Sequence, residues 1–193
     1  MRQEDTKRKI LEQALRLFSV NGYAAVSVEQ IAQAVGIRAP SLYKHYKSKR
    51  DIFAQIVAEM ERQDAAFAAA CGVPGVPVQD APQAYAHVPM DSIRAFSTAL
   101  FRHWTEDVFA AGFRRLLTLE QYRDLEMAGL YRQYLSAGPL AYMADIFAPP
   151  AGGAAAGMAL ALEFYGPMFL LYSVYDDAAD KAAVLPLLEA HSD

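Results

Sequence analysis

The segment from Ser27 to Lys47 constrains the fold more than any other part of the chain, because it carries the signals of two short helices joined by a tight turn. Ser27 is a residue type that caps helix starts, and Gln30 three positions later completes a capping box. Gly36 supplies the turn, where a positive φ costs glycine little. Pro40 stands at the start of the second helix, where proline is tolerated. The pattern predicts a helix-turn-helix.

The second helix, predicted from Pro40 to Tyr46, carries side chains suited to nucleic acid. Leu42 and Tyr46 lie one turn apart and are expected to face inward. The other reading is a surface helix with aromatic anchors in its own small core. In a helix-turn-helix the second helix enters the major groove of DNA. The residues of this helix that are left for the nucleic acid are Ser41, Tyr43, Lys44 and His45.

The charge distribution agrees with a DNA-binding N-terminus. Residues 1–50 hold ten Lys/Arg and four Asp/Glu, which gives this segment a net charge of +6. Because the whole chain has a net charge of −4, residues 51–193 have a net charge of −10. Clustered lysines on a solvated face explain the positive charge, but not the change of sign between the two segments. A basic head attracts phosphates, whereas an acidic body is repelled by them.

The residues flanking this motif carry a family resemblance. Residues 7–57 resemble the N-terminal domain of TetR-family transcriptional regulators, through residues 10–18 (ILEQALRLF), residues 21–23 (NGY) and the helix-turn-helix. Residues 42–53 (LYKHYKSKRDIF) are close to the family pattern LYxHFxxKxxLF, with Tyr46 and Ile52 in place of Phe and Leu.

The resemblance also implies roles for the head. Ser27, Tyr43, His45 and Lys49 match positions that hold phosphates in this family, whereas Val26 and Val28 stand where threonines are frequent. Arg38, Ser41 and Lys44 are the candidates for base edges, because Arg or Lys toward guanine is the commonest specific contact. With the resemblance included, the predicted DNA-binding residues are Ser27, Arg38, Ala39, Pro40, Ser41, Tyr43, Lys44, His45 and Lys49.

The whole chain is predicted to be all-α, with a helix-turn-helix DNA-binding domain over 1–50 and a helical effector-binding and dimerisation domain over 51–193. Helices are expected over about 4–20, 48–70, 91–104, 112–124 and 125–147, the last broken near Gly138-Pro139. Residues 72–90 hold four prolines and two glycines and are predicted to form a loop or linker. Residues 148–153 are predicted to be a turn, followed by helices over 154–175 and 178–190.

Residues 154–175 are mostly apolar and long enough to cross a membrane. Glu163 near the middle makes lipid burial costly, and three aspartates rather than basic residues follow the segment. No membrane is therefore predicted. The family resemblance implies instead a homodimer through residues 154–190, formed as a four-helix bundle by the last two long helices of each subunit. Two heads on a two-fold axis would read a palindromic site.

The body is rich in aromatic residues and methionine with scattered polar groups, which is typical of ligand pockets. Such stripes also form ordinary cores, so core packing is the alternative for each residue. The resemblance implies a small-molecule effector. The ligand-binding candidates are Phe96, His103, Trp104, Tyr122, Tyr131, Glu163, Phe164 and Met168.

Other chemistries lack motifs. There is no G-x-S-x-G elbow, phosphate-binding glycine loop or H-E-x-x-H, so an enzyme is not predicted. His87 and His103 near Asp91 or Glu106 form a scattered set, and no metal or cofactor is predicted. Cys71 is the single cysteine, so no intrachain disulfide forms. The N-terminus does not resemble a signal peptide, and a cytoplasmic location is expected.

These observations predict a sequence-specific transcriptional regulator, most often a repressor, released from a palindromic operator by a small apolar or aromatic effector. The alternative is an architectural or division-linked DNA-binding protein on the same fold without an effector. A third possibility is a helical enzyme or carrier that retains the head.

Overall fold

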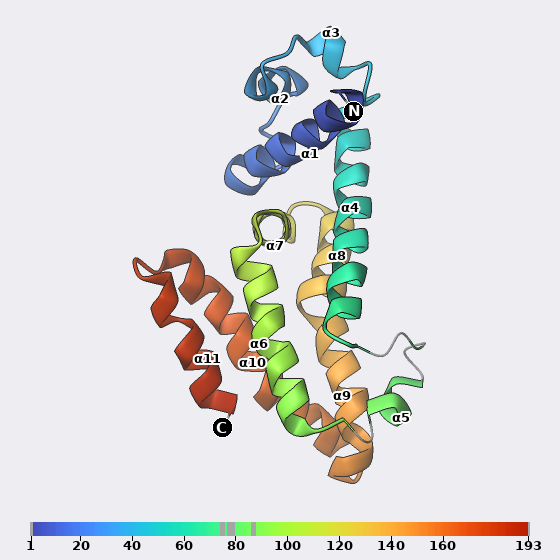
Figure 1. Ribbon diagram of the computed structural model, residues 1–193, viewed down its shortest axis with the longest axis vertical. Helices are drawn as coiled ribbons and strands as arrows, with labels where there is room; N and C mark the ends of the chain where they lie inside the picture. The colour runs from blue at the N-terminus through green and yellow to red at the C-terminus, as the bar shows by residue number, and fades with distance from the viewer. Residues whose placement is uncertain (1, 74–75, 77–79, 86–87, 193) are drawn as a thin grey trace. The chain divides into compact units, whose positions relative to one another are not determined.

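The computed structural model describes residues 2–73, 76, 80–85 and 88–192, and all regular structure within these residues is helical (Figure 1). The prediction of an all-α chain is confirmed. The helices are α1 (Arg2–Asn21), α2 (Val28–Val35), α3 (Ala39–Leu42), α4 (Lys49–Ala70), α5 (Ala81–Tyr85), α6 (Met90–Glu106), α7 (Val108–Glu120), α8 (Leu125–Leu135), α9 (Ala137–Ala151), α10 (Ala154–Asp177), the 3-10 turn η2 (Lys181–Ala183) and α11 (Leu185–Ser192).

The chain forms two compact units. Unit 1 comprises Met1–Ala66 and Val108–Ala128, and unit 2 comprises Phe67–Asp107 and Gly129–Asp193. Helix α7 therefore belongs to the same unit as the helix-turn-helix, although 65 or more residues separate it from α3 in the sequence. The predicted boundary at residue 50 separates a DNA-binding domain from an effector-binding and dimerisation domain. This functional division stays a prediction.

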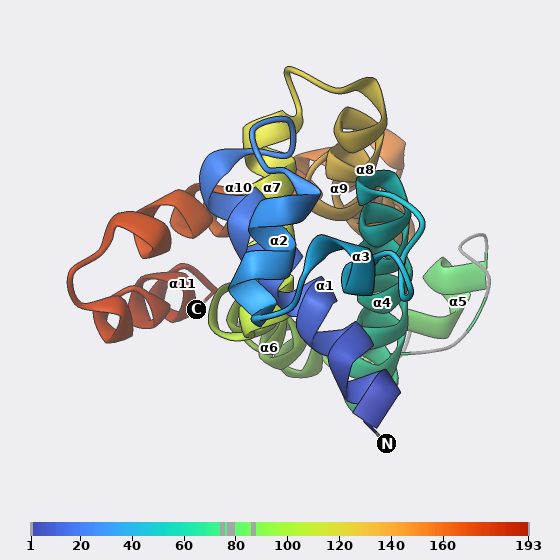
Figure 2. The same cartoon turned by 90° about the horizontal axis from the view of Figure 1, so that it is seen from above.

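The core of unit 1 forms where α1 packs against α2 and α7. Helix α7 is seen end-on beneath α1 in Figure 1, and Figure 2 shows α2 lying over α1. One face of α1 is buried, and the first half of α4 adds its own buried side chains to the unit. These core residues are Ile10, Ala14, Leu15, Phe18, Ile52, Phe53, Ile56 and Met60.

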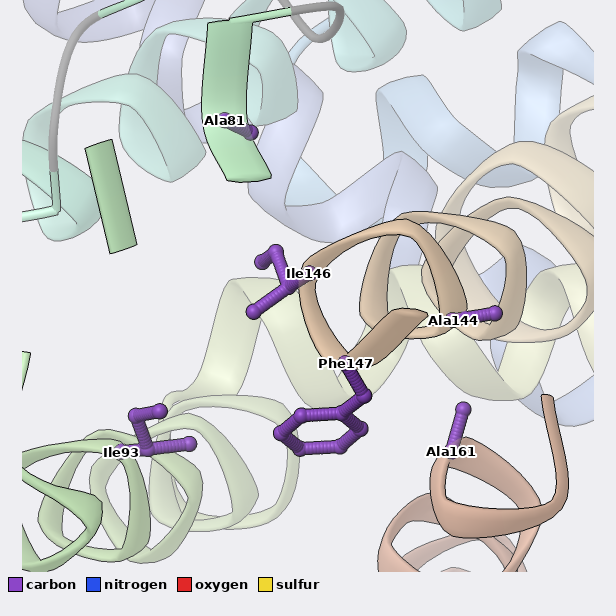
Figure 3. Packing of buried hydrophobic residues seen from close by; sticks show 6 residues of the cluster. All are labelled: Ala81, Ile93, Ala144, Ile146, Phe147 and Ala161. Carbon is purple, nitrogen blue, oxygen red and sulfur yellow. The ribbon is translucent and has the colours of Figure 1, made fainter. Parts of the chain in front are cut away.

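The core of unit 2 is built on the long contact between α9 and α10, to which α5 and α6 add side chains. Figure 3 shows one cluster in which Phe147 of α9 points into the space between Ile93 of α6 and Ala161 of α10. Phe164 of α10 packs against Phe147 edge to face, with the ring centroids 5.6 Å apart. Residues from four helices therefore share one hydrophobic cluster.

Several predicted boundaries were wrong. The predicted loop over 72–90 contains α5, because Ala81 is fully buried in the core cluster and its packing outweighs the loop signal of the neighbouring prolines. The predicted turn over 148–153 is mostly helical, since α9 runs to Ala151 and ends at Gly152 with φ +86°. The predicted break near Gly138-Pro139 is confirmed, and falls at Ser136 between α8 and α9.

The second helix of the helix-turn-helix is shorter than predicted. Helix α3 ends at Leu42, and the amides of Lys44 and His45 bond to carbonyls three residues back instead of four. Tyr46 is buried, and its hydroxyl donates to the carbonyl of Lys7 over 3.1 Å. This tertiary contact holds the chain in tight turns where local spacing alone favoured continued α-helix.

Candidate nucleic-acid interface

Helix α2 is fixed at both ends by contacts within its own sequence. The Ser27 hydroxyl accepts the amide N–H of Gln30 over 3.2 Å, and the Gln30 side-chain oxygen accepts the amide N–H of Ser27 over 2.7 Å. Gly36 adopts φ +76° and its amide bonds back to Ala32 and Gln33. The predicted capping box and glycine turn are both confirmed, and they set the direction in which the chain enters α3.

Helix α3 presents one face to unit 1 and the other to solvent. Arg38 precedes it in an extended conformation, and Pro40 lies in its first turn. Leu42 is fully buried and Tyr46 nearly so, as the spacing predicted. Of the predicted DNA-binding residues, Ser27, Arg38, Pro40, Tyr43 and Lys44 are exposed, whereas Ala39, Ser41, His45 and Lys49 are half-buried.

The exposed members of this set combine positive charge with an aromatic ring. Arg38 and Lys44 lie at either end of α3, and the side chain of Tyr43 is half exposed between them in sequence. The side chain of His45 is half-buried. Its Nδ1 atom is buried and has no hydrogen-bond partner among the described residues. The surface therefore offers two cations and a phenol from one turn-and-helix segment.

Lys49 lies in a different setting from the exposed cations. Its ammonium donates to the carbonyls of Tyr23 (2.9 Å) and Val26 (2.8 Å), and more distantly to that of Ala24 (3.4 Å). Burial lowers the pKa of Lys49, and the negative charge of Glu120 acts in the opposite direction. The predicted phosphate contact of Lys49 thus has three main-chain oxygens as competitors.

The start of α4 carries its own anion. The Ser48 hydroxyl accepts the amide N–H of Asp51 over 3.0 Å, and the Asp51 carboxylate accepts the amide N–H of Lys47 over 2.7 Å. Ser48 thus caps α4, at the residue where the predicted helix over 48–70 begins. The amides of Lys47 and Asp51 are therefore already paired, which leaves fewer backbone donors for a phosphate at this helix start.

The predicted ligand-binding residues do not all come together. Phe96, His103 and Trp104 of α6 form an aromatic cluster in unit 2 with Phe67 and Tyr134. The ring of His103 stacks on that of Phe67 with the centroids 4.4 Å apart and the planes 12° apart. Trp104 is buried, and its ring meets that of Tyr134 edge to face at 6.1 Å.

The remaining ligand candidates occupy other environments. Tyr131 and Met168 are buried in unit 2, and Phe164 packs on the cluster around Phe147. Glu163 is exposed on α10. Tyr122 is 89% exposed in the turn after α7 and belongs to unit 1, whereas the aromatic cluster lies in unit 2. Tyr122 was predicted as a ligand contact from the aromatic-rich composition of the body, and composition does not indicate which side chains are exposed.

Two residues of unit 1 have contacts that sequence reasoning did not find. Glu120 at the end of α7 is 3% exposed, and its carboxylate accepts the amide N–H of Tyr23 over 2.9 Å. The Tyr23 ring packs between Phe18 and Phe53, with centroids 5.1 and 5.6 Å away. No local signal marks Glu120, because its partner lies 97 residues away in the sequence.

Metal-binding chemistry has no assembled site in the described part of the chain, where no group of three or more His, Cys, Asp or Glu side chains is placed to hold an ion. His87, one member of the scattered set considered from sequence, lies outside the described residues. Cys71 is exposed just after α4.

Comparison with known proteins identifies the head. The family model of bacterial regulatory proteins, tetR family, matches residues 10–56. The chain is similar to the HTH-type transcriptional regulator AcrR of Shigella flexneri, with 42% identity over 53 residues, which is 28% of this chain and 25% of that protein. It is also similar to IcaR of Staphylococcus aureus, a negative transcriptional regulator of the biofilm operon icaADBC, with 43% identity over 51 residues covering 26% of this chain and 27% of that one.

The chain therefore spans about a quarter of the length of the curated relatives it matches. A solved structure of a TetR-like transcriptional regulator from Rhodococcus sp. RHA1 matches nearly the whole fold, with a TM-score of 0.66 over 97% of this chain and 93% of that one. The sequence identity in this match is 20%, so it concerns the fold alone.

Proposed function

Residues 10–56 belong to the TetR family of bacterial regulatory proteins, and from this premise we propose that the chain is a sequence-specific, DNA-binding transcriptional repressor. The observation that carries the proposal is the capped α2–α3 pair, which presents Arg38, Tyr43 and Lys44 to solvent on a head with a net positive charge. IcaR, which the head resembles, is a negative regulator. This similarity favours repression over activation.

In the proposed complex α3 enters the major groove. Arg38, Ser41 and Lys44 would read base edges, with Ala39 and Pro40 approaching the groove floor. Ser27, Tyr43 and His45 would contact phosphates, which fix the register of the head without reading sequence. Lys49 was predicted to join this second group, but its ammonium donates to the carbonyls of Tyr23 and Val26.

One head with a four-residue α3 buries too little surface to select a single site, so the proposed regulator is a homodimer on a palindromic operator. Its half-sites would be about 34–36 Å apart, or a multiple of that distance. The proposed interface lies within residues 154–190. Met158, Leu162 and Phe169 are exposed apolar residues of α10, and their spacing places them on one face of that helix.

Helix α10 is also long and apolar enough to cross a membrane by length and composition, with 28% of its most apolar window buried. Helices at the core or interface of soluble proteins meet the same criterion. The charge of Glu163 near its middle favours burial against a second protein subunit over burial in lipid. A second copy of this chain is therefore the proposed occupant.

The proposed effector is a small apolar or aromatic molecule bound by unit 2. The aromatic cluster of Phe67, Phe96, His103, Trp104 and Tyr134 supports this choice, since such rings line most ligand sites. Trp104 is the single tryptophan, so its fluorescence reports on the cluster. An effector that quenches Trp104 should also lower operator affinity, with a coupling of about 1–3 kcal/mol.

The test is a selection from a random duplex pool at two salt concentrations. A palindromic consensus that survives at the higher salt supports a dimeric regulator and supplies the operator for effector screening. Binding without a consensus, lost steeply as salt rises, leaves only the electrostatic contribution of the phosphates. That result contradicts the proposal and favours an architectural DNA-binding protein.

A further inference from the structure

The protons of the Lys49 ammonium face the turn that joins α1 to α2. Its nitrogen lies 2.9 Å from the carbonyl oxygen of Tyr23, 2.8 Å from that of Val26 and 3.4 Å from that of Ala24. The same nitrogen stands 4.5 Å from the centroid of the Tyr23 ring. An ammonium has three donors, and these oxygens engage them. The Lys49 side chain therefore binds the backbone of the turn between α1 and α2.

Glu120, at the end of α7, contacts the same turn that Lys49 contacts. Its carboxylate accepts the amide N–H of Tyr23 over 2.9 Å. Gly22 permits this approach, because a Cβ at that position would stand 2.7 Å from the same carboxylate oxygen. Gly22 also has φ +82°, which disfavours any other residue. The hydrogen bonds of the Glu120 carboxylate and of the Lys49 ammonium therefore both require this conformation of the turn. All of these residues belong to unit 1.

The turn is placed directly before the DNA-facing segment. Val26 accepts from Lys49 and is followed immediately by Ser27, the N-cap of α2. A shift of the turn would move the start of α2 and, through the Gly36 turn, the start of α3. The ring of Tyr23 is packed against Phe18 and Phe53, so the turn is fixed by its side chain as well as by its backbone.

We propose that Lys49 and Glu120 are positioning residues that clamp the Gly22–Val26 turn and thereby set the pose of α2 and α3 on DNA. Lys49 then contributes to operator affinity through the turn and not by neutralising a phosphate. Glu120, on a helix far from the helix-turn-helix in sequence, is a part of the DNA-binding machinery. The inference rests on the proposed DNA-binding function.

Salt dependence separates a clamp from a phosphate contact. The test measures the affinity of the full chain for its selected operator across salt concentrations, for the wild type, Lys49→Met and Lys44→Met. Removing a phosphate contact reduces the slope of log affinity against log salt by about one. We expect Lys49→Met to weaken binding about tenfold with the slope unchanged, a loss that corresponds to one main-chain anchor. Lys44→Met is the comparison for an exposed lysine that is proposed to read a base edge, and it should relax selectivity at one position of each half-site. A slope reduced by about one in Lys49→Met would overturn the assignment.

Glu120 is tested with a conservative pair. Glu120→Ala removes the acceptor for the Tyr23 amide and should weaken operator binding about tenfold, whereas Glu120→Gln keeps an amide oxygen and should recover most of that loss. Arg123→Ala is the matched control, because Arg123 is exposed and lies 3.9 Å from the same carboxylate oxygen. Equal operator affinity in wild type and Glu120→Ala would overturn the role of Glu120.

Hydrogen exchange of the Tyr23 amide tests the clamp without DNA. We expect protection in the wild type and Glu120→Gln, and faster exchange at Tyr23 in Glu120→Ala while the amides of α1 stay protected. Loss of protection throughout α1 would mean that Glu120 only maintains the fold, and would overturn the local clamp. A wild type that binds no duplex would overturn the proposed function and the DNA-binding role of the clamp. An unprotected Tyr23 amide in the wild type would overturn the clamp itself.

Discussion

Gly157 of α10 lies so close to Ala148 of α9 that a Cβ at position 157 would stand 2.7 Å from both the backbone nitrogen and the Cα of Ala148. The same Cβ would approach the carbonyl oxygen of Ala144 to 2.7 Å. These are helix backbone atoms, which cannot move aside as the end of a flexible side chain can. The most extensive helix pair of unit 2 therefore depends on the absence of a side chain at residue 157.

Gly157→Ala should lower the free energy of unfolding by about 1–3 kcal/mol, the usual cost of overpacking. Urea unfolding followed by circular dichroism measures this change. Gly129→Ala in α8 is the matched control, because its nearest neighbour for a new Cβ is the Arg132 guanidinium at 3.9 Å. The control should gain up to about 1 kcal/mol from helix propensity. Equal stability of the two variants would contradict the close packing.

Ser27 caps a helix and is also proposed to contact a phosphate. Its hydroxyl caps α2, so Ser27→Ala should cost about 1 kcal/mol of stability, whereas Ser27→Asp should preserve the cap. If the hydroxyl also contacts a phosphate, both variants should bind the operator more weakly than the wild type. Thermal unfolding and operator titration of both variants distinguish the roles. Full operator affinity in a folded Ser27→Asp variant would exclude a phosphate contact.

Ionisation of Tyr46 is expected to lower the free energy of unfolding at high pH. Burial raises the pKa of Tyr46 from 10.0 to about 12, with a smaller contribution from Asp51 in the same direction. The folded state favours the neutral phenol, so this contribution is present below pH 10 and is lost as the pH rises from about 10 toward 12.

The matching variant is Tyr46→Phe, which keeps the ring but cannot ionise or donate to the Lys7 carbonyl. The stability difference between wild type and Tyr46→Phe should shrink across pH 10–12. Because all other tyrosines are common to both proteins, their titration cancels in this difference. A difference that stays constant over this range would show that the Tyr46 pKa is not raised in the folded state.

Lys44 is exposed at the end of α3 and is proposed to read a base edge. Lys44→Ala should cost about 1–3 kcal/mol of operator affinity and relax selectivity at one position of each half-site. A repeated selection with the variant measures both effects. Arg62→Ala, an exposed cation of α4 paired with Glu59, should leave the consensus unchanged. Equal weakening on every sequence by Lys44→Ala would assign Lys44 to the phosphate backbone.

Leu162 tests the proposed dimer interface. The side chain is about half exposed on α10, and Leu162→Lys would place a charge within the apolar face that it shares with Met158 and Phe169. Sedimentation velocity should show dimers of the wild type and monomers of this variant at micromolar concentration. Leu125→Lys, at an exposed apolar position in unit 1, should remain dimeric. A dimeric Leu162→Lys protein would place the interface elsewhere.

Features that depend on neighbouring residues were predictable from the sequence. The Ser27–Gln30 capping box, the Gly36 turn and the Ser48 N-cap are all contacts between residues at most four apart. Their geometry follows from residue type and spacing, and tertiary packing does not alter it. The inward face of Leu42 and Tyr46 was predictable for the same reason, because helical spacing sets which side chains share a face.

The ends of the short helices were less predictable. Helix α3 stops at Leu42 because Tyr46 is anchored to Lys7 on α1, and α5 forms where the sequence predicts a loop because Ala81 is buried against α9. In both cases a contact with a remote helix outweighs a weak local preference. Composition likewise selected Tyr122 as a ligand contact, although the fold leaves it exposed.

The sequence by itself determined the helical class, the helix-turn-helix and its basic surface, since these follow from periodicity, caps and charge within short stretches. Only the tertiary structure decided which charged side chains are available to DNA. Lys44 and Lys49 are both lysines of one motif, yet the first is exposed and the second donates to the carbonyls of Tyr23 and Val26. The carboxylate of Glu120 reaches the same turn from 97 residues away. The physical reason is that a hydrogen bond depends on distance in space, and residue spacing determines that distance only within an element.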